Sequence, residues 1–235
     1  MTPAAPPAPA PGAASGAAFA AAWPVAGIVL RTERLELRPV RDADLPELAA
    51  AARGGIHDDA RMPFVTGWTD APPEEWGRRF TQYFWRRRAT WSRDAWGLPF
   101  AVRLRATGEA IGVQELKADG FPVLREVRSG SWLASAHQRQ GYGTEMRGAV
   151  LELAFTGLGA EVASTSAYLF NAGSLGVSER LGYVRTGVRR DAVRGRAEEA
   201  VLLRLPRWRW EKTRGRPVVE IAGLDAACLE LLGVA

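Results

Sequence analysis

The sequence contains very little cysteine and histidine: Cys228, His57 and His137 are the only such residues among 235. A single cysteine cannot form an intramolecular disulfide, and none of the three has metal-ligand spacing to another. No metal site is therefore expected. The lack of paired cysteines favours a reducing compartment, so we expect the protein in the cytoplasm.

Long apolar runs are also missing. No segment approaches the roughly 18 to 20 consecutive apolar residues that span a bilayer, and residues 1–22 lack a basic stretch ahead of an aliphatic core. A membrane partner is therefore not expected. Residues 1–24 are mostly Ala, Pro and Gly, with Phe19 and Trp23 as their aromatic side chains, so we expect a disordered tail.

Lysine is nearly absent, because only Lys117 and Lys212 are lysines among the 31 basic residues. The formal net charge of +5 would suit a nucleic-acid partner, and residues 86–88 and 189–190 are short arginine runs. However, the abundance of Arg, Ala and Gly is also typical of GC-rich coding, and no RNA- or DNA-binding motif accompanies the runs. Solvated arginines are the favoured interpretation, so no nucleic-acid partner is expected.

What remains is the composition of a folded α+β protein. Hydrophobic residues make up 47% of the chain, and no repeat is visible, so we expect one domain over residues 25–213 and an added strand and short helix over 214–235. Alternating apolar residues predict strands, and apolar residues at helical spacing predict helices. The expected strands lie at 28–38, 98–105, 110–117, 123–135, 162–169, 183–190, 197–205 and 217–221, and the expected helices at 45–53, 74–88, 139–158, 171–181 and 224–232.

A glycine-containing turn between a strand and a helix carries the main chemical signal. Residues 138–144 read Gln-Arg-Gln-Gly-Tyr-Gly-Thr, and free backbone N–H groups at a helix N-terminus bind anions. The dinucleotide fingerprint fails, because residue 146 is Met and no third glycine has the required spacing. The Walker phosphate-binding motif does not match either, because its lysine is missing. The remaining pattern is Gln/Arg-x-x-Gly-x-Gly/Ala.

This pattern resembles the pyrophosphate loop of the GCN5-related N-acetyltransferases (GNAT). Residues 30–39, residues 141–145, and Asn171 with Ser174 followed by residues 181–183 resemble the ribosomal-protein-alanine acetyltransferase branch of that family. Residues 55–64 and 129–133 are also similar to a mycobacterial GNAT succinyltransferase. The resemblance implies a mixed, mostly antiparallel twisted sheet flanked by helices, with a splayed central strand pair that holds acyl-CoA.

The resemblance also implies a set of CoA-binding residues. Main-chain groups of Leu133 and Ser135 would contact the pantetheine arm, and the Leu133 N–H would polarise the thioester carbonyl. Asn171 would hold a pantetheine amide, although Asn171 as a helix N-cap and Ser174 as a first-turn filler are the simpler interpretations. The full predicted CoA set is Leu133, Ser135, Gln138, Arg139, Gln140, Gly141, Tyr142, Gly143, Thr144, Asn171 and Ser174.

Acid and base residues are less well marked. Glu115 is the first candidate base and Glu126 the second, and both also suit an ordinary strand carboxylate. Many GNAT enzymes place a proton-donating Tyr seven residues after the Asn. This chain has Ser178 there, whose weakly acidic hydroxyl would only donate a hydrogen bond or relay a water.

The acceptor amine is expected to bind between the loop at 57–68 and the helix at 74–88, so His57, Asp58, Arg61 and Trp68 are candidate substrate residues. Arg128 is a candidate partner for the distal carboxylate of succinyl-CoA. Alternatively, Arg128 points to solvent or pairs with Glu126.

The sequence therefore predicts an enzyme that transfers an acetyl or succinyl group from CoA to a primary amine of a protein or small molecule. The alternative is a non-catalytic acyl-CoA sensor. Acyl-CoA and the amine are the expected partners, and a homodimer is possible.

Overall fold

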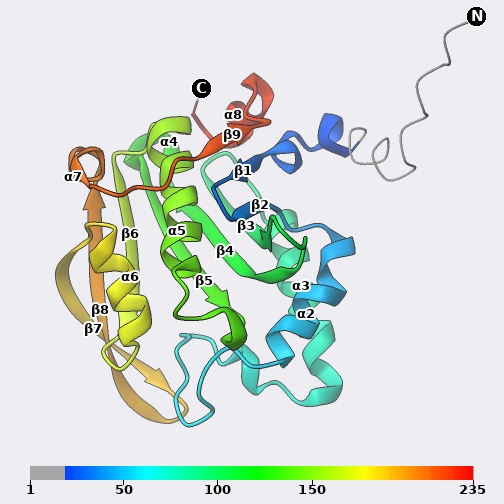
Figure 1. Cartoon of the computed structure of the whole chain (residues 1–235), viewed down its shortest axis with the longest axis vertical. Coiled ribbons are helices and arrows are strands. Elements are labelled where there is room, and N and C mark those ends of the chain that lie inside the picture. The colour runs from blue at the N-terminus through cyan, green and yellow to red at the C-terminus, as the bar shows by residue number, and fades with distance from the viewer. Residues whose placement is uncertain (1–18, 235) are drawn as a thin grey trace, which may run out of the picture.

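A single mixed sheet organises the molecule (Figure 1). The computed structural model describes residues 19–234. Within them nine strands lie in the order β7-β8-β6-β5-β4-β3-β2-β1-β9, and β5–β6 is the parallel pair of this otherwise antiparallel sheet. The predicted α+β class and mostly antiparallel sheet are confirmed. The strands are β1 Val29–Arg31, β2 Leu35–Pro39, β3 Ala95–Leu104, β4 Ala110–Asp119, β5 Glu126–Leu133, β6 Val162–Tyr168, β7 Val184–Val193, β8 Arg196–Pro206 and β9 Glu220–Ala222.

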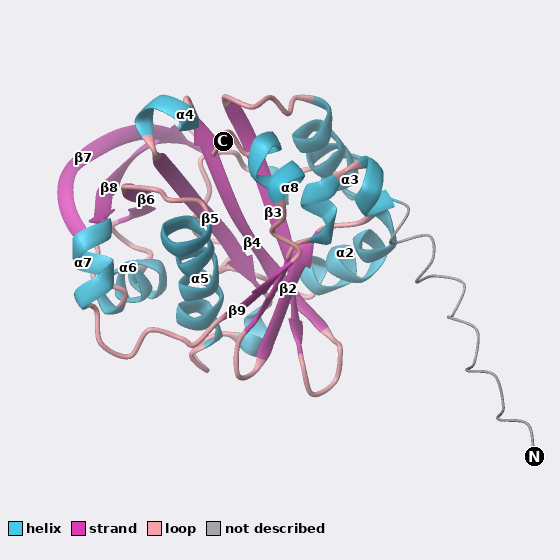
Figure 2. Ribbon diagram, turned by 90° about the horizontal axis from the view of Figure 1, so that it is seen from above, coloured by secondary structure: helices cyan, strands magenta, loops and turns pink. Residues whose placement is uncertain are grey.

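Helices cover both faces of this sheet (Figure 2). On one face, Trp76 and Phe80 pack in a cluster with Ala101 and Val113. On the other face, Val150 packs in a larger cluster with the neighbouring strand positions. Strands β3 and β4 are therefore apolar on both faces and read as nearly continuous buried runs. The helices are α2 Leu45–Arg53, α3 Pro73–Ala89, α4 Phe121–Leu124, α5 Tyr142–Glu152, α6 Ala172–Arg180, α7 Arg207–Lys212 and α8 Ala226–Leu231.

The central pair β5–β6 separates along its length. The two strands pair only where residues Glu126 to Arg128 meet Val162 to Ser164. Beyond that point β5 continues along β4 as far as Leu133, while β6 continues along β8 as far as Tyr168. The predicted splayed pair is therefore present, and it opens toward the N-terminus of α5.

Two segments near the N-terminus differ from the sequence-based expectation. The single strand predicted over 28–38 is a hairpin of β1 and β2, because the Leu35 N–H donates to Thr32 Oγ1 at 3.1 Å and closes a tight turn. Residues 19–24 are not disordered: 19–22 are helical, and the Trp23 ring packs edge-on against Trp91 at 5.3 Å. The rest of the predicted tail, residues 1–18, lies outside the described residues.

The C-terminal segment packs against the N-terminal half of the sheet. Strand β9 pairs antiparallel with β1, and the indole N–H groups of Trp91 and Trp96 donate to the carbonyls of Leu231 and Leu232. A division of the chain at residue 213 stays a prediction. Among residues 19–234, no helix is both long and apolar enough to cross a membrane.

Candidate active site

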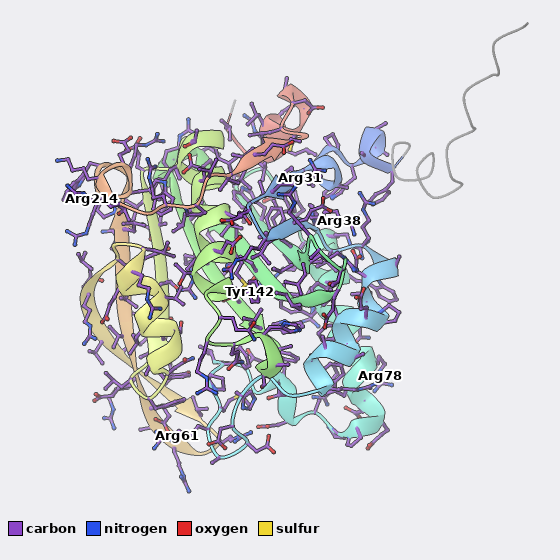
Figure 3. All side chains as sticks on the ribbon, in the orientation of Figure 1. Arg31, Arg38, Arg61, Arg78, Tyr142 and Arg214 are labelled. Carbon is purple, nitrogen blue, oxygen red and sulfur yellow. The ribbon has the colours of Figure 1, made fainter. Side chains whose placement is uncertain are left out.

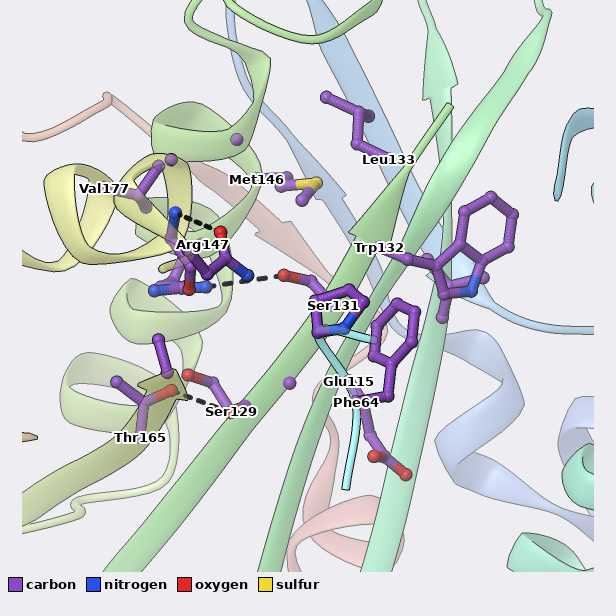
Figure 4. A pocket seen from close by; sticks show the side chains of 18 of the residues that line it. Phe64, Glu115, Ser129, Ser131, Trp132, Leu133, Met146, Arg147, Thr165 and Val177 are labelled. Atoms are coloured by element: carbon purple, nitrogen blue, oxygen red, sulfur yellow. Dashed lines mark hydrogen bonds between the residues drawn. The ribbon is translucent and has the colours of Figure 1, made fainter. Parts of the chain in front are cut away.

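A large cleft passes between the separated ends of β5 and β6. Its volume of about 2800 Å³ exceeds the roughly 300–1,000 Å³ of ordinary small-ligand pockets. It is lined from both faces of the sheet, by Arg147 and Asn171 on the α5–α6 side and by Glu115 and Tyr83 on the α3 side. Figure 4 shows Arg147 and Ser131 on one side of β5 and Glu115 on the other. A ligand can therefore be reached from both faces.

The predicted pyrophosphate loop forms the mouth of this cleft on the α5 side. Gly141 is the N-cap of α5 and has a left-handed backbone with φ of 87°, which favours glycine. Gly143 and Thr144 follow in the first turn and line the cleft. Gln138 secures the loop, because its Nε2 donates to the carbonyls of Leu133 and Ile56 at 2.8 Å each. The free N–H groups of the first turn can thus bind an anion.

Not every predicted CoA residue reaches the cleft. Arg139 does, but Ser135, Gln140 and Tyr142 do not line it. The Ser135 N–H donates to the Gly55 carbonyl at 2.9 Å and is not free for a ligand, so the main-chain contact of Ser135 with pantetheine stays a prediction. The Tyr142 ring lies at the start of α5 (Figure 3), where Arg34 stacks on it at 4.4 Å. Gln140 Nε2 donates to Ala136 O, so Gln140 and Tyr142 stabilise the loop.

The edge of β5 that faces the opening carries main-chain polar groups. The Ala134 N–H donates to Ile111 of β4, so strand alternation directs the N–H groups of Leu133 and Ser131 the other way, into the opening. Thr165 confirms the direction, since its Oγ1 donates to the Ser129 carbonyl from β6 at 3.1 Å. The Leu133 N–H therefore faces the opening, and its contact with the thioester stays a prediction. Ser131 has the same orientation and was not predicted.

Asn171 is the N-cap of a helix, the simpler of its two predicted roles, and its side chain can still contact a pantetheine amide. Its Oδ1 accepts from the Ser174 N–H at 3.1 Å and caps α6. Both residues line the cleft. The Asn171 Nδ2 is left as the group that could donate to a ligand carbonyl.

Ser178 cannot act as predicted. It is 0% exposed and does not line the cleft. Its hydroxyl donates to the Ser174 carbonyl at 3.0 Å and accepts from Arg147 Nη1 at 2.8 Å. The hydroxyl proton is thus committed inside α6, and Arg147 lies between Ser178 and the cleft wall.

Arg147 is the main residue that the sequence analysis missed. Its side chain is only 4% exposed, yet it lines the cleft beside Ser131. Burial lowers the pKa of Arg147. Helical spacing in the sequence could have identified it. Arg147 lies four residues before the fully buried Leu151 and seven before Ala154, so its charge falls on the buried face of the helix.

The opposite side of the cleft holds the candidate base. Glu115 is 6% exposed, and its Oε1 pairs with Arg87 Nε at 2.7 Å. Tyr83 lies beside this pair and accepts from Arg87 Nη2 at 3.3 Å. Burial of its hydroxyl and the nearby Glu115 carboxylate raise the pKa of Tyr83, which therefore stays neutral. The second candidate, Glu126, pairs with Arg204 at 3.0 Å.

The four predicted acceptor residues line the same cleft from the loop between α2 and α3. Both ring nitrogens of His57 are engaged, Nε2 by Thr69 Oγ1 at 2.9 Å and Nδ1 by the Asp58 carbonyl at 2.8 Å. Arg61 stacks on Phe170 at 5.0 Å. His57 and Asp58 therefore shape the loop. Trp68 forms an aromatic wall with its neighbours Phe64, Trp76, Phe80 and Trp132.

Arg128 points to the α3 side of the sheet, as strand alternation from Trp132 requires. It pairs with Asp119, and its side chain is 50% exposed. The alternative that Arg128 pairs with Glu126 is wrong, because its partner is Asp119 and Glu126 pairs with Arg204. Arg128 therefore already has a counter-charge within the chain and does not need one from a ligand.

The chain belongs to the acetyltransferase (GNAT) domain family, whose model matches residues 34–184. The resemblance inferred from the motifs is confirmed at the level of the family. Within residues 19–234, no group of three or more His, Cys, Asp and Glu side chains could hold a metal ion.

Solved structures share this fold at low identity. Mycobacterium smegmatis RimJ, in complex with CoA-disulfide, is 20% identical, with a TM-score of 0.64 over 83% of this chain and 97% of that one. RimL, a ribosomal L7/L12 alpha-N-protein acetyltransferase in complex with coenzyme A, is 15% identical, with a TM-score of 0.61 over 76% and 97%. A GCN5-related N-acetyltransferase from Brucella melitensis is 20% identical, with a TM-score of 0.63 over 79% and 81%.

Proposed function

We propose that this chain is an acyl-CoA-dependent N-acyltransferase that moves an acetyl or succinyl group from CoA to a primary amine by direct attack. One observation carries the proposal: the cleft crosses the sheet, with an anion-binding helix N-terminus on one face and a buried carboxylate on the other. A thioester held in the opening would be exposed to an amine from the far side.

The α5–α6 side is assigned to the donor. The first turn of α5 would bind the pyrophosphate, and the Asn171 Nδ2 would hold a pantetheine carbonyl. The Leu133 N–H would stabilise the oxyanion that forms when the amine attacks, an interaction typically worth about 3–4 kcal/mol. The Ser131 N–H, two residues along the strand and so about 7 Å away, would face another part of the donor. The thiolate then leaves and takes a proton.

The α2–α3 side is assigned to the acceptor. Its aromatic wall around Trp68 would bind the apolar part of the acceptor, and Glu115 would take the proton released by the amine. An α-amine, with a pKa of roughly 7.7–8.0, needs less help from a base than a lysine amine at roughly 10.4. Because Arg87 is paired with Glu115, a weak base is expected, and a protein N-terminus is the favoured acceptor. RimL, which shares the fold, is described as an alpha-N-protein acetyltransferase.

A sensor that binds acyl-CoA without turnover is the second candidate. The committed Ser178 hydroxyl and the Glu115–Arg87 pair favour it, because neither group is free to move a proton readily. The two candidates differ in turnover. An enzyme should release free thiol from acetyl-CoA or succinyl-CoA in the presence of peptides with free N-termini, whereas a sensor should bind CoA in calorimetry and release none. The cytoplasm remains the proposed location.

A further inference from the structure

Arg147 is a buried cation that has no acidic partner. Among residues 19–234, no carboxylate lies within 4.0 Å of its guanidinium, and its Nε has no hydrogen-bond partner. Its remaining contacts are the hydroxyls of Ser178 at 2.8 Å and Ser131 at 3.5 Å. The nearby phenol of Tyr183 does not neutralise it, because burial raises the pKa of Tyr183.

The largely buried guanidinium of Arg103, outside the cleft, shows the contrasting arrangement. Arg103, whose side chain is 14% exposed, binds Asp44 at 2.9 Å and Glu47 at 2.7 Å. Removing water from an unpaired charge is costly, and proteins normally avoid it with a counter-ion. The position of Arg147 on the cleft wall indicates that a ligand supplies the missing anion.

The location of Arg147 restricts which anion this can be. The N–H groups free to bind a pyrophosphate belong to the first turn of α5, which begins at Tyr142. Arg147 lies more than a turn further along, where the hydroxyl groups of Ser129, Ser131 and Thr165 line the cleft beside the apolar Met146 and Val177 (Figure 4). The Ser131 hydroxyl accepts from Arg147 and keeps its own proton to donate. Guanidinium and hydroxyl donors together suit a carboxylate.

We infer that Arg147 binds the distal carboxylate of the acyl group, so the preferred donor is the CoA thioester of a short dicarboxylic acid, such as succinyl-CoA. This inference rests on the proposed function and adds the donor class and the residue that selects it. An acetyl group carries no charge and would leave Arg147 unpaired. The competing assignment is that Arg147 stabilises the leaving thiolate, in which case every donor would need it equally.

The test compares kcat/KM for succinyl-CoA and acetyl-CoA, with one amine, in the wild type and in Arg147→Met. Methionine keeps an unbranched apolar stem and removes the charge. We expect the variant to lose at least tenfold with succinyl-CoA and less than threefold with acetyl-CoA. Arg103→Met is the matched control: it also removes a buried guanidinium, but one outside the cleft, and should lower the melting temperature while leaving the donor ratio unchanged.

A binding measurement separates this inference from the proposed function. Calorimetry of CoA, acetyl-CoA and succinyl-CoA with the wild type and Arg147→Met needs no amine and no turnover. If the wild type does not bind CoA, the proposed function fails. If CoA binds but succinyl-CoA has no advantage over acetyl-CoA that Arg147→Met removes, the inference alone is overturned. Equal losses of affinity for both donors in Arg147→Met would show that Arg147 does not recognise the acyl group and would also overturn it.

Discussion

The two sides of the cleft treat buried charge differently. On the α3 side, Glu115 and Arg87 form an ion pair within the chain. On the α5–α6 side, Arg147 is buried just as deeply as Glu115 but has only hydroxyl contacts. The Glu115–Arg87 pair is electrostatically complete without a ligand. Arg147 gains a counter-charge only when an anion binds.

The pKa values of the two arginines follow the same division. Burial is the largest influence on Arg87 and lowers its pKa, but the Glu115 carboxylate and the Tyr83 hydroxyl together outweigh burial, so the net change is upward. Burial lowers the pKa of Arg147, and no carboxylate opposes the change. The comparison teaches that burial alone does not distinguish the two arginines, whereas the lack of a carboxylate partner on the cleft wall does.

The largest expected effect tests whether Glu115, on the acceptor side, acts as the general base. Glu115→Gln should lower kcat by about 100-fold, because a positioned general base typically contributes 10²–10⁴-fold, while the Kd for CoA stays within twofold. Glu126→Gln is the control, since it changes a cleft-lining carboxylate that pairs with Arg204 instead. A kcat for Glu115→Gln within threefold of the wild type would leave Glu115 as a structural partner of Arg87.

The next effect should be confined to the donor side. Gly141→Val forces a β-branched residue into a backbone with φ of 87° and brings its Cβ to 3.2 Å from Arg34 Nη2. We expect CoA affinity in calorimetry to fall at least tenfold, since the loop N–H groups would be redirected. Gly108→Val is the control, because it has a similar φ of 76° in a remote hairpin with nothing within 4 Å. Equal CoA affinity in the two variants would contradict the loop assignment.

A smaller effect should distinguish the sides at the level of substrate binding. Trp68→Leu removes the centre of the aromatic wall, so the KM for the amine should rise by about threefold or more, in proportion to the lost apolar contact. The Kd for CoA should stay constant. Trp208→Leu, at an exposed position on α7 outside the cleft, should change neither. A rise in the CoA Kd in Trp68→Leu would show that the two sides are not separable.

The smallest effect concerns the ion pair that joins the acceptor loop to the β7–β8 hairpin. The Arg194 guanidinium binds Asp70 and lowers the pKa of that carboxyl. A depressed carboxyl pKa stabilises the fold above the unfolded value of about 3.9, and this stabilisation is lost as the pH falls through the folded value. For a solvent-exposed pair, Arg194→Met should lower the melting temperature by about 1–3 °C at pH 7. The part of this difference that comes from the ion pair should shrink as the pH falls below about 4, toward the lowered pKa of Asp70. The part that comes from the hydrogen bond of Arg194 to the Asp59 carbonyl should remain, so a difference that does not shrink at all would contradict the ion-pair assignment.

Much of the fold could be predicted, because periodicity and turn residues report local structure. The loop at 138–144 fixed the family, and the helix at 74–88 matches α3, Pro73–Ala89. A local sequence pattern does not show which hydrogen-bonding and packing groups become partners across the fold. The Thr32 turn and the packing of Trp23 on Trp91 were therefore missed. For the same reason the commitment of the Ser178 hydroxyl to Ser174 and Arg147 was not foreseen.

A crystal structure of the wild-type protein with succinyl-CoA tests the account most directly, because it shows the donor and its carboxylate together. The account predicts the pantetheine arm between β5 and β6, the pyrophosphate at the first turn of α5, and the succinyl carboxylate within about 3.5 Å of the Arg147 guanidinium. A carboxylate that instead faces solvent or Arg128, or a CoA bound outside the β5–β6 opening, would contradict it.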